Sequence, residues 1–441
     1  MCLRHAAHNL GILTCPVPYS PVRPAEMLAA TTLKSAHDPG SPGLAPAVDK
    51  VSGPNGSHFD KLDHLRFLAA LLILLHHGVP AVICAVNGLA CDAVNTVRLT
   101  ANLSGLDLIA KALVFEGHSA VALFITLSGF LFARICGTAA IRYDKFVVNR
   151  ILRIYPMYTC AILLAMYLAP ASNGIVNLAT SLFCLQNLLS PVAHTLITPP
   201  LWTVAVEFQF YLLFPFFLQW FSKRGAKPIL LLLAASLLTK CLVFLQTGSV
   251  RELSYLTLFG RIDQFIVGML AGWYYLRFAN YLRNPLLVLV SSSVVVSMLT
   301  IFHLKGGFLG TANKSIWLVW PLMESVAWMF VIVTYCASSF KLPERASKVL
   351  CALGAVSFSM YLCHYGFAHL IAQKLGPVIK LALSQNDHWL HPLVAFAFQQ
   401  QFYGSIAFVF LIILPATVIF SGLTYFAVEK PFMDMRVKYK L

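Results

Sequence analysis

The run LRFLAALLILLHHGVPAVICAV at positions 65–86 decides the fold, because it is long and apolar enough to cross a bilayer as one helix. It also holds Arg66 near one end and the pair His76 and His77 further along. Charged and titratable side chains are costly in hydrocarbon, so they usually line a polar path or site. Arg66 and His77 are eleven residues apart, which predicts that they share one helical face, about 16 Å apart along the axis.

The composition of the whole chain agrees with a membrane protein. Hydrophobic residues make up 59% of the 441 residues and charged residues only 11%, whereas a soluble domain carries about 25% charged residues. These values exclude a soluble domain and predict an all-α, polytopic helix bundle in a lipid bilayer. The net charge of +15 does not indicate nucleic-acid binding, because Lys and Arg concentrate in alternate loops, as membrane topology requires.

Ten segments have the length and apolarity of membrane spans. They lie at 65–84, 119–136, 152–170, 201–221, 228–246, 257–278, 285–303, 316–338, 350–371 and 403–426. A shorter apolar stretch at 178–190 is either a re-entrant or interfacial helix or an eleventh span. The basic loops predict that both termini are cytoplasmic.

The domain organisation follows from these spans. We expect a flexible cytoplasmic tail at 1–58, a membrane domain at 59–432 and a basic cytoplasmic tail at 433–441. We expect the membrane to be the inner (plasma) membrane of a bacterium.

The cysteines and histidines show no metal-ligand spacing such as CxxC or HExxH. The sequence therefore predicts neither a metal site nor a permanently bound cofactor. Most of the eleven cysteines lie in apolar segments and are interpreted as small hydrophobic residues. Cys84 and Cys91 flank a short outer loop, and the sequence does not decide whether they form a disulfide or remain free thiols.

Seven segments in order resemble the acyltransferase type 3 family. They are 62–77, 117–135, 146–158, 199–215, 261–272, 357–364 and 428–432, with sequences such as GHSAVALFITLSGFLFARI, PPLWTVAVEFQFYLLFP and SFSMYLCH. Members of this family are integral-membrane enzymes that move an acyl group, often acetyl, onto hydroxyls of cell-surface glycans and related molecules. The resemblance implies the same class of reaction for this chain.

The family's Arg-x10-His signature falls on Arg66 and His77, and the resemblance implies that His77 is essential and acts as a general base. Acyl transfer to an alcohol requires removal of the hydroxyl proton, for which a neutral imidazole is suited near pH 7. The alternative is a histidine that only hydrogen-bonds a neighbouring helix. For Arg66, the alternatives are a role in holding an anionic donor and an interfacial ion pair with Asp63.

Arg150 and Arg153 are the predicted donor site. They are three residues apart on one face at the cytoplasmic mouth of the third predicted span, and Arg is suited to phosphate recognition. We therefore expect them to bind acyl-CoA, most simply acetyl-CoA, as the donor substrate. Positive-inside topology alone also places arginines here.

Glu207 is the only acid within the fourth predicted span, and a buried carboxylate needs a partner. It either orients His77, binds the acceptor, or pairs with a buried cation such as Arg261. Trp202 and Tyr211 on the same span offer faces for stacking on a sugar, or form an interfacial aromatic belt.

Asp263 and His364 are expected in the outer half of the membrane. Each is a candidate for acceptor binding. Asp263 equally suits an ion pair with another helix, and His364 equally suits support of His77. Ser128 lies among small residues without a nucleophile-elbow motif, so we interpret it as a packing residue.

Sorted by depth, these residues predict a vectorial mechanism. The CoA phosphates dock inside, the acyl-pantetheine arm reaches into the bundle, and a hydroxyl of a glycan or glycolipid enters from outside. One alternative function is a secondary transporter that exports a sugar or anionic metabolite, although no internal repeat is visible. A second alternative is an acyltransferase acting on a small secreted metabolite.

Overall fold

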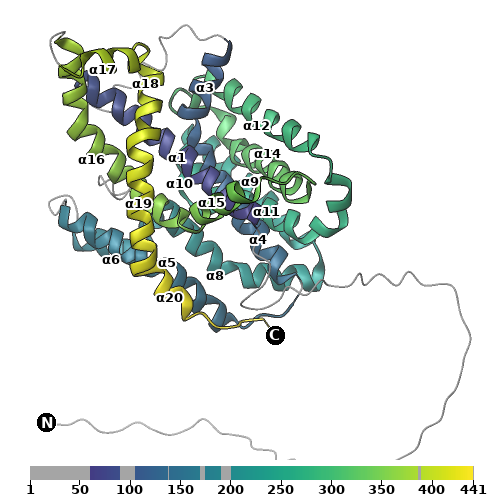
Figure 1. Ribbon diagram of the computed structural model, residues 1–441. Helices are drawn as coiled ribbons and strands as arrows, with labels where there is room; N and C mark the ends of the chain where they lie inside the picture. The colour runs from purple at the N-terminus through teal and green to yellow at the C-terminus, as the bar shows by residue number, and fades with distance from the viewer. Residues whose placement is uncertain are drawn as a thin grey trace, which may run out of the picture. The chain divides into compact units, whose positions relative to one another are not determined.

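Helices form nearly all of the chain that the computed structural model describes, which is residues 60–89, 105–137, 139–168, 174–189, 200–385 and 389–440 (Figure 1). The long helices are α1 (Asp60–Asn87), α4 (Ala120–Cys136), α5 (Tyr143–Leu168), α8 (Leu201–Arg224), α9 (Lys227–Thr247), α11 (Leu258–Phe278), α12 (Leu286–Leu304), α14 (Trp320–Ala337) and α16 (Ser357–Ser384). Shorter helices are α3 (Gly105–Phe115), α6 (Ile175–Leu182), α7 (Gln186–Leu189), α10 (Arg251–Leu256), α13 (Gly307–Gly310), α15 (Glu344–Ala355), α17 (His391–Ala397), α18 (Gln401–Phe408), α19 (Leu414–Thr424) and α20 (Lys430–Asp434). Across these described ranges there is no strand, and one isolated β-bridge joins Ile141 to Lys440.

The helices confirm an all-α membrane bundle. Eight helical segments in the described ranges are long and apolar enough to cross a membrane, one of them the continuous run Gln401–Asp434 that contains α18, α19 and α20. The number is nine if α15 and α16, bent by 68°, are counted as one span. Among the described residues the predicted spans are largely helical, but 350–371 is divided by the bend between α15 and α16. The predicted span at 257–278 is α11, which is 21 residues long but carries charged side chains and is not among the eight.

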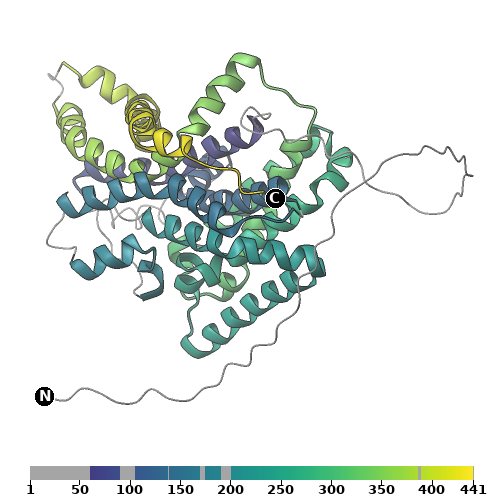
Figure 2. The same cartoon turned by 90° about the horizontal axis from the view of Figure 1, so that it is seen from below.

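Helix α1 packs at the centre of the bundle (Figures 1 and 2). It contacts α16 and α15 most extensively, and also α4, α3 and α14. Pro80 lies within the helix, where its ring removes one backbone hydrogen bond without ending the helix. The position of α1 places the side chains of its predicted polar face inside protein rather than in lipid.

Helices α4 and α11 pack closely along their length. The close approach depends on glycines, because a Cβ at Gly268 would collide with the backbone carbonyl of Thr126, and one at Gly272 with that of Phe130. The hydrophobic effect does not drive helices together in lipid. Helix association there depends instead on close packing, which small residues permit. Gly129 on α4 makes the reciprocal approach to the backbone of α11.

The stretch at 178–190 forms two short helices, α6 and α7, with eight and four described residues. At 1.5 Å per residue neither crosses a hydrocarbon core of about 30 Å, which favours the re-entrant or interfacial interpretation. The tail at 1–58 and Cys91 lie outside the described residues.

The C-terminal segment runs back along the start of α5. Asn149 on α5 donates to the Val437 carbonyl at 2.6 Å and accepts from the Val437 amide at 2.9 Å. The Arg142 amide donates to the Tyr439 carbonyl at 2.8 Å. The segment 435–440 is thereby held beside the arginines of α5.

Candidate active site

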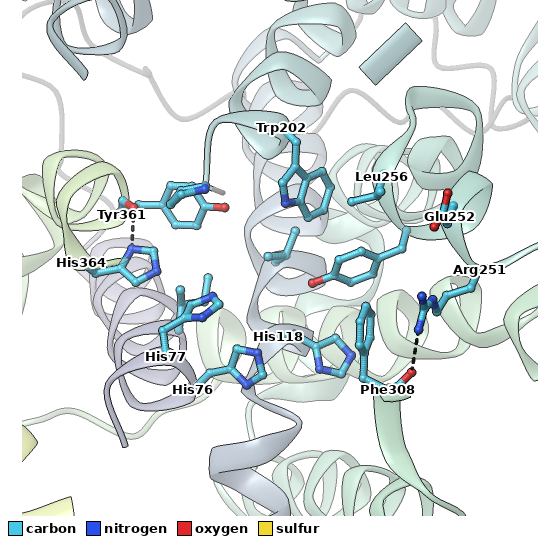
Figure 3. A pocket seen from close by; sticks show the side chains of 14 residues that line it. His76, His77, His118, Trp202, Arg251, Glu252, Leu256, Phe308, Tyr361 and His364 are labelled. Atoms are coloured by element: carbon cyan, nitrogen blue, oxygen red, sulfur yellow. Dashed lines mark hydrogen bonds between the residues drawn. The ribbon is translucent and has the colours of Figure 1, made fainter. Parts of the chain in front are cut away.

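Two cavities lined in part by α1 contain most of the polar residues of the sequence prediction. The first, here named the histidine cavity, has a volume of about 290 Å³. Its polar and aromatic lining consists of His76, His77, His118, Trp202, Arg251, Glu252, Tyr255, Phe308, Tyr361 and His364 (Figure 3). The second, here named the arginine cavity, has a volume of about 110 Å³. Its polar lining consists of Arg66, Ser128, Arg150, Arg153, Thr203, Glu207, Tyr211, Ser357 and Tyr361.

The adjacent histidines of α1, His76 and His77, line the histidine cavity, and they have different neighbours. The Nδ1 of His76 lies 3.2 Å from the Val114 carbonyl, which ties that ring to the end of α3. The His77 ring lies 5.2 Å, between centroids, from each of the His364 and Tyr365 rings of α16. His77 therefore faces α16, while the His76 ring faces His118, with 5.7 Å between the ring centroids.

His364 is held with one nitrogen directed away from its own backbone. Its Nδ1 donates to the Tyr361 carbonyl at 2.6 Å (Figure 3). A carbonyl only accepts, so Nδ1 carries the hydrogen and Nε2 of the neutral ring is an acceptor. That Nε2 is buried and has no hydrogen-bond partner among the described residues, and the residue is 2% exposed. The ring thus offers a proton acceptor beside His77.

His118 lines this cavity and Glu116 contacts His118, although the sequence prediction gave neither a role. His118 lies in the short helix η2 (Gly117–Ser119), with its Nδ1 3.7 Å from Glu116 Oε2. Glu116 Oε1 lies 2.8 Å from His303 Nδ1, and Oε2 accepts from the Phe308 amide at 3.2 Å. The signal was present in the sequence, since a carboxylate and an imidazole directly precede an apolar helix.

Aromatic rings form the other wall of the histidine cavity. The Trp202 and Tyr255 rings lie 5.0 Å apart, and Tyr255 lies 4.7 Å from Phe308. Arg251 at the edge donates to the Phe308 carbonyl at 3.5 Å (Figure 3). This wall combines ring faces with hydrogen-bonding groups, a combination suited to a hydroxylated ligand.

The arginine cavity contains three guanidinium groups with different partners. Arg66 pairs with Asp63 at 2.5 Å and Arg153 with Glu429 at 3.1 Å. Arg150 instead lies over aromatic rings, at 5.0 Å from the centroid of Phe132 and 5.7 Å from that of Tyr211.

The Nε of Arg150 is buried without a hydrogen-bond partner in the described chain. Partial burial, and then the cations of Arg150 and Arg153, lower the pKa of Arg436 in the C-terminal segment below its ordinary value. Positive charge is therefore concentrated at this end of the site, and Arg150 has donor capacity that no described side chain uses.

Glu207 lies in the arginine cavity, whereas His77 lines the histidine cavity. The Glu207 carboxylate accepts a hydrogen bond from Ser128 at 2.9 Å and a second from Tyr211. Ser128 therefore does more than pack. The two aromatic residues predicted to stack on a sugar are also separated, since Trp202 lines the histidine cavity and Tyr211 the arginine cavity.

Asp263 lines neither of the two cavities. It is fully buried and pairs with Lys240 of α9 at 2.6 Å, as the ion-pair interpretation expects. Arg261 lies 3.8 Å from Glu324 and donates to Gln264 at 3.0 Å, so it is not the partner of Glu207. In the parts of the chain that are described, no group of three or more His, Cys, Asp or Glu residues could hold a metal ion.

The fold and the two cavities define a polytopic membrane protein with a polar site inside its helix bundle. The family described as "Acyltransferase domain" matches residues 59–426, a range that includes every residue lining the two cavities. The chain belongs to the acyltransferase type 3 family, and it is an integral-membrane acyltransferase. No curated protein and no solved structure matches the chain.

Proposed function

We propose that this acyltransferase moves an acetyl or other short acyl group from acyl-CoA to a hydroxyl of a glycan or glycolipid, with His77 as general base. The observation that carries the proposal is the pairing of two unlike cavities along α1. Arginines line one cavity and histidines line the other, with Arg66 and His77 about 16 Å apart on the same helix. This separation suits a donor with an anionic head and a long neutral arm.

The arginine cavity fits the anionic end of acyl-CoA. A CoA molecule carries a pyrophosphate and a 3′-phosphate, and guanidinium groups bind phosphate through charge-assisted hydrogen bonds. Arg150 supports this assignment because its Nε has no partner among the described residues. Arg153 and Arg66 are expected to contribute, and Glu207 to position the arm through its contacts with Ser128 and Tyr211.

The histidine cavity fits a sugar hydroxyl as acceptor. Trp202, Tyr255 and Phe308 offer ring faces, while Arg251 and Glu252 at the cavity supply hydrogen-bonding groups. Its volume of about 290 Å³ is at the small end of ligand pockets, as expected for one sugar unit of a larger acceptor. His364 is expected to contact the acceptor or His77.

The chemistry needs no acyl-enzyme. His77 takes the proton of the acceptor hydroxyl as its oxygen attacks the thioester carbonyl carbon. The carbon–sulfur bond then breaks, the acyl group stays on the acceptor oxygen, and the proton passes from His77 to the CoA sulfur. His77 lies beside His364 in the histidine cavity, where the acceptor enters.

We propose ten crossings with both termini in the cytoplasm, in the plasma membrane of a bacterium. The tenth crossing requires α11, whose charged residues are paired inside the bundle, so low hydropathy does not exclude it from the membrane. This topology places the arginine cavity on the cytoplasmic side, where acyl-CoA is made, and the histidine cavity toward the opposite side.

Two assays test the proposal. The first measures consumption of acetyl-CoA by purified protein without an ion gradient. The second measures O-acylation of cell-surface glycans by mass spectrometry of cells that produce each variant. His77→Ala is expected to abolish O-acylation, whereas His369→Ala, on the same helix as His364 but outside both cavities, retains it. Arg150→Met is expected to raise the KM for acetyl-CoA by about tenfold or more. Arg142→Met is the matched control, because Arg142 is exposed and paired with Asp144.

Normal O-acylation by the His77→Ala variant would contradict the assignment of the base. An unchanged KM in the Arg150→Met variant would contradict the donor site. Transport of a sugar or anion without consumption of acetyl-CoA would favour the transporter alternative.

A further inference from the structure

The two cavities share one lining residue within the described chain, Tyr361 of α16. Its hydroxyl forms a 2.6 Å hydrogen bond with the hydroxyl of Thr203 on α8, and Thr203 lines the arginine cavity. Both residues are buried, with exposed fractions of 8% and 5%. A single side-chain hydrogen bond therefore joins two helices at the boundary between the cavities.

Tyr361 makes two separate contacts. Its side chain bonds Thr203 at the boundary between the cavities, and its backbone carbonyl bonds His364. The Tyr361 carbonyl accepts the 2.6 Å hydrogen bond from His364 Nδ1, while its ring packs against Phe124 at 5.8 Å between centroids. The carbonyl stays with the helix when the ring rotates. Movement of the ring can therefore open the boundary without releasing His364 from its position beside His77.

We propose that Tyr361, held by Thr203, makes this enzyme select the acceptor hydroxyl over water. The proposal rests on the proposed function. The closed ring separates a thioester in the arginine cavity from His77 and from water in the histidine cavity. The acyl-pantetheine arm displaces the ring when it enters the histidine cavity, where the acceptor occupies the space that water would take.

An open boundary permits a defined side reaction. His77 takes a proton from water, the water oxygen attacks the thioester carbonyl carbon, and the carbon–sulfur bond breaks. The products are the free carboxylic acid and CoA thiol, with the proton passing from His77 to sulfur. The ratio of hydrolysis to transfer therefore reports whether the boundary closes.

The first experiment measures CoA thiol release from acetyl-CoA by purified protein without any acceptor. Tyr361→Phe and Thr203→Val each remove the hydrogen bond and keep most of the side-chain volume. Each is expected to raise acceptor-independent release by about threefold to tenfold, the factor that one buried hydrogen bond represents. Thr334→Val is the matched control, since it removes the hydrogen bond between the hydroxyls of Thr334 on α14 and Ser291 on α12, and neither residue lines either cavity.

The second experiment does not depend on catalysis. In inverted membrane vesicles, a His77→Cys variant is treated with a membrane-impermeant thiol reagent, and labelling of residue 77 is followed by peptide mass. Adding Tyr361→Phe or Thr203→Val is expected to speed labelling, whereas adding Thr334→Val does not.

Unchanged labelling and unchanged CoA release in both boundary variants would overturn the proposal. Faster labelling in a protein that never consumes acetyl-CoA would leave the boundary role standing and contradict the proposed function instead. The two failures are therefore distinguishable.

Discussion

Replacing Lys240 tests whether Asp263 is a structural residue or an acceptor-binding one. The two side chains are 1% and 0% exposed and lie 2.6 Å apart. At an effective dielectric constant of about 20, opposite charges at this distance attract by about 6 kcal/mol, and burial of both charges offsets much of this. Lys240→Met leaves a buried carboxylate without its cation, which is expected to cost about 3–5 kcal/mol.

The assay heats detergent-solubilised protein and measures the fraction that stays monodisperse by size-exclusion chromatography. Lys240→Met is expected to lower the midpoint temperature by several degrees, and addition of Asp263→Asn to restore most of the loss. Lys348→Met is the control, because Lys348 and Glu344 also lie 2.6 Å apart but are 75% and 81% exposed. Exposed pairs contribute little to stability.

Equal midpoints for Lys240→Met and Lys348→Met would refute the reasoning about this buried pair. The stable double variant then separates the two roles of Asp263. If it transfers acyl groups normally, Asp263 only holds α9 against α11. Loss of transfer in a stable double variant would show that Asp263 also acts on the acceptor.

Two further substitutions test the packing of α4 on α11 and the contacts of Glu116. Gly268→Leu is expected to abolish the monodisperse protein, because the new side chain would collide with the backbone of Thr126. Gly422→Leu is the control and is expected to be tolerated, because nothing lies within 4 Å of its Cβ position. Equal yields of the two variants would contradict the proposed packing of α4 on α11. Glu116→Ala removes the acceptor of His303 and of one amide, and is expected to cost about 1–3 kcal/mol, with Glu116→Gln closer to wild type by the same heating assay. Full stability of the Ala variant would argue against the interaction.

The membrane fold was predictable because its cause is local. Hydropathy and the need to satisfy backbone hydrogen bonds in lipid leave helices as the solution for each long apolar run. In the described ranges the helices largely match the predicted spans, except at the bend between α15 and α16. A charged helix such as α11 is harder to classify from hydropathy, because its charges are paired with residues of other helices.

The depth of the site residues was only partly predictable. The helical spacing of Arg66 and His77 places them at different cavities, one at each end of the site. The same reasoning did not place Glu207 with the arginines, because its partners Ser128 and Tyr211 were not known to converge there. The direction in which a polar side chain points depends on which helix lies next to it.

Sequence alone determined the class of protein and most of its helices, and it singled out Arg66 and His77, which line different cavities. These properties depend on composition and on helical periodicity, which act within one segment. Only the tertiary structure decided that His303 meets Glu116, 187 residues away, and that Tyr361 meets Thr203, 158 residues away. Such contacts depend on how whole helices pack, and no local pattern records the packing of segments so far apart in the chain.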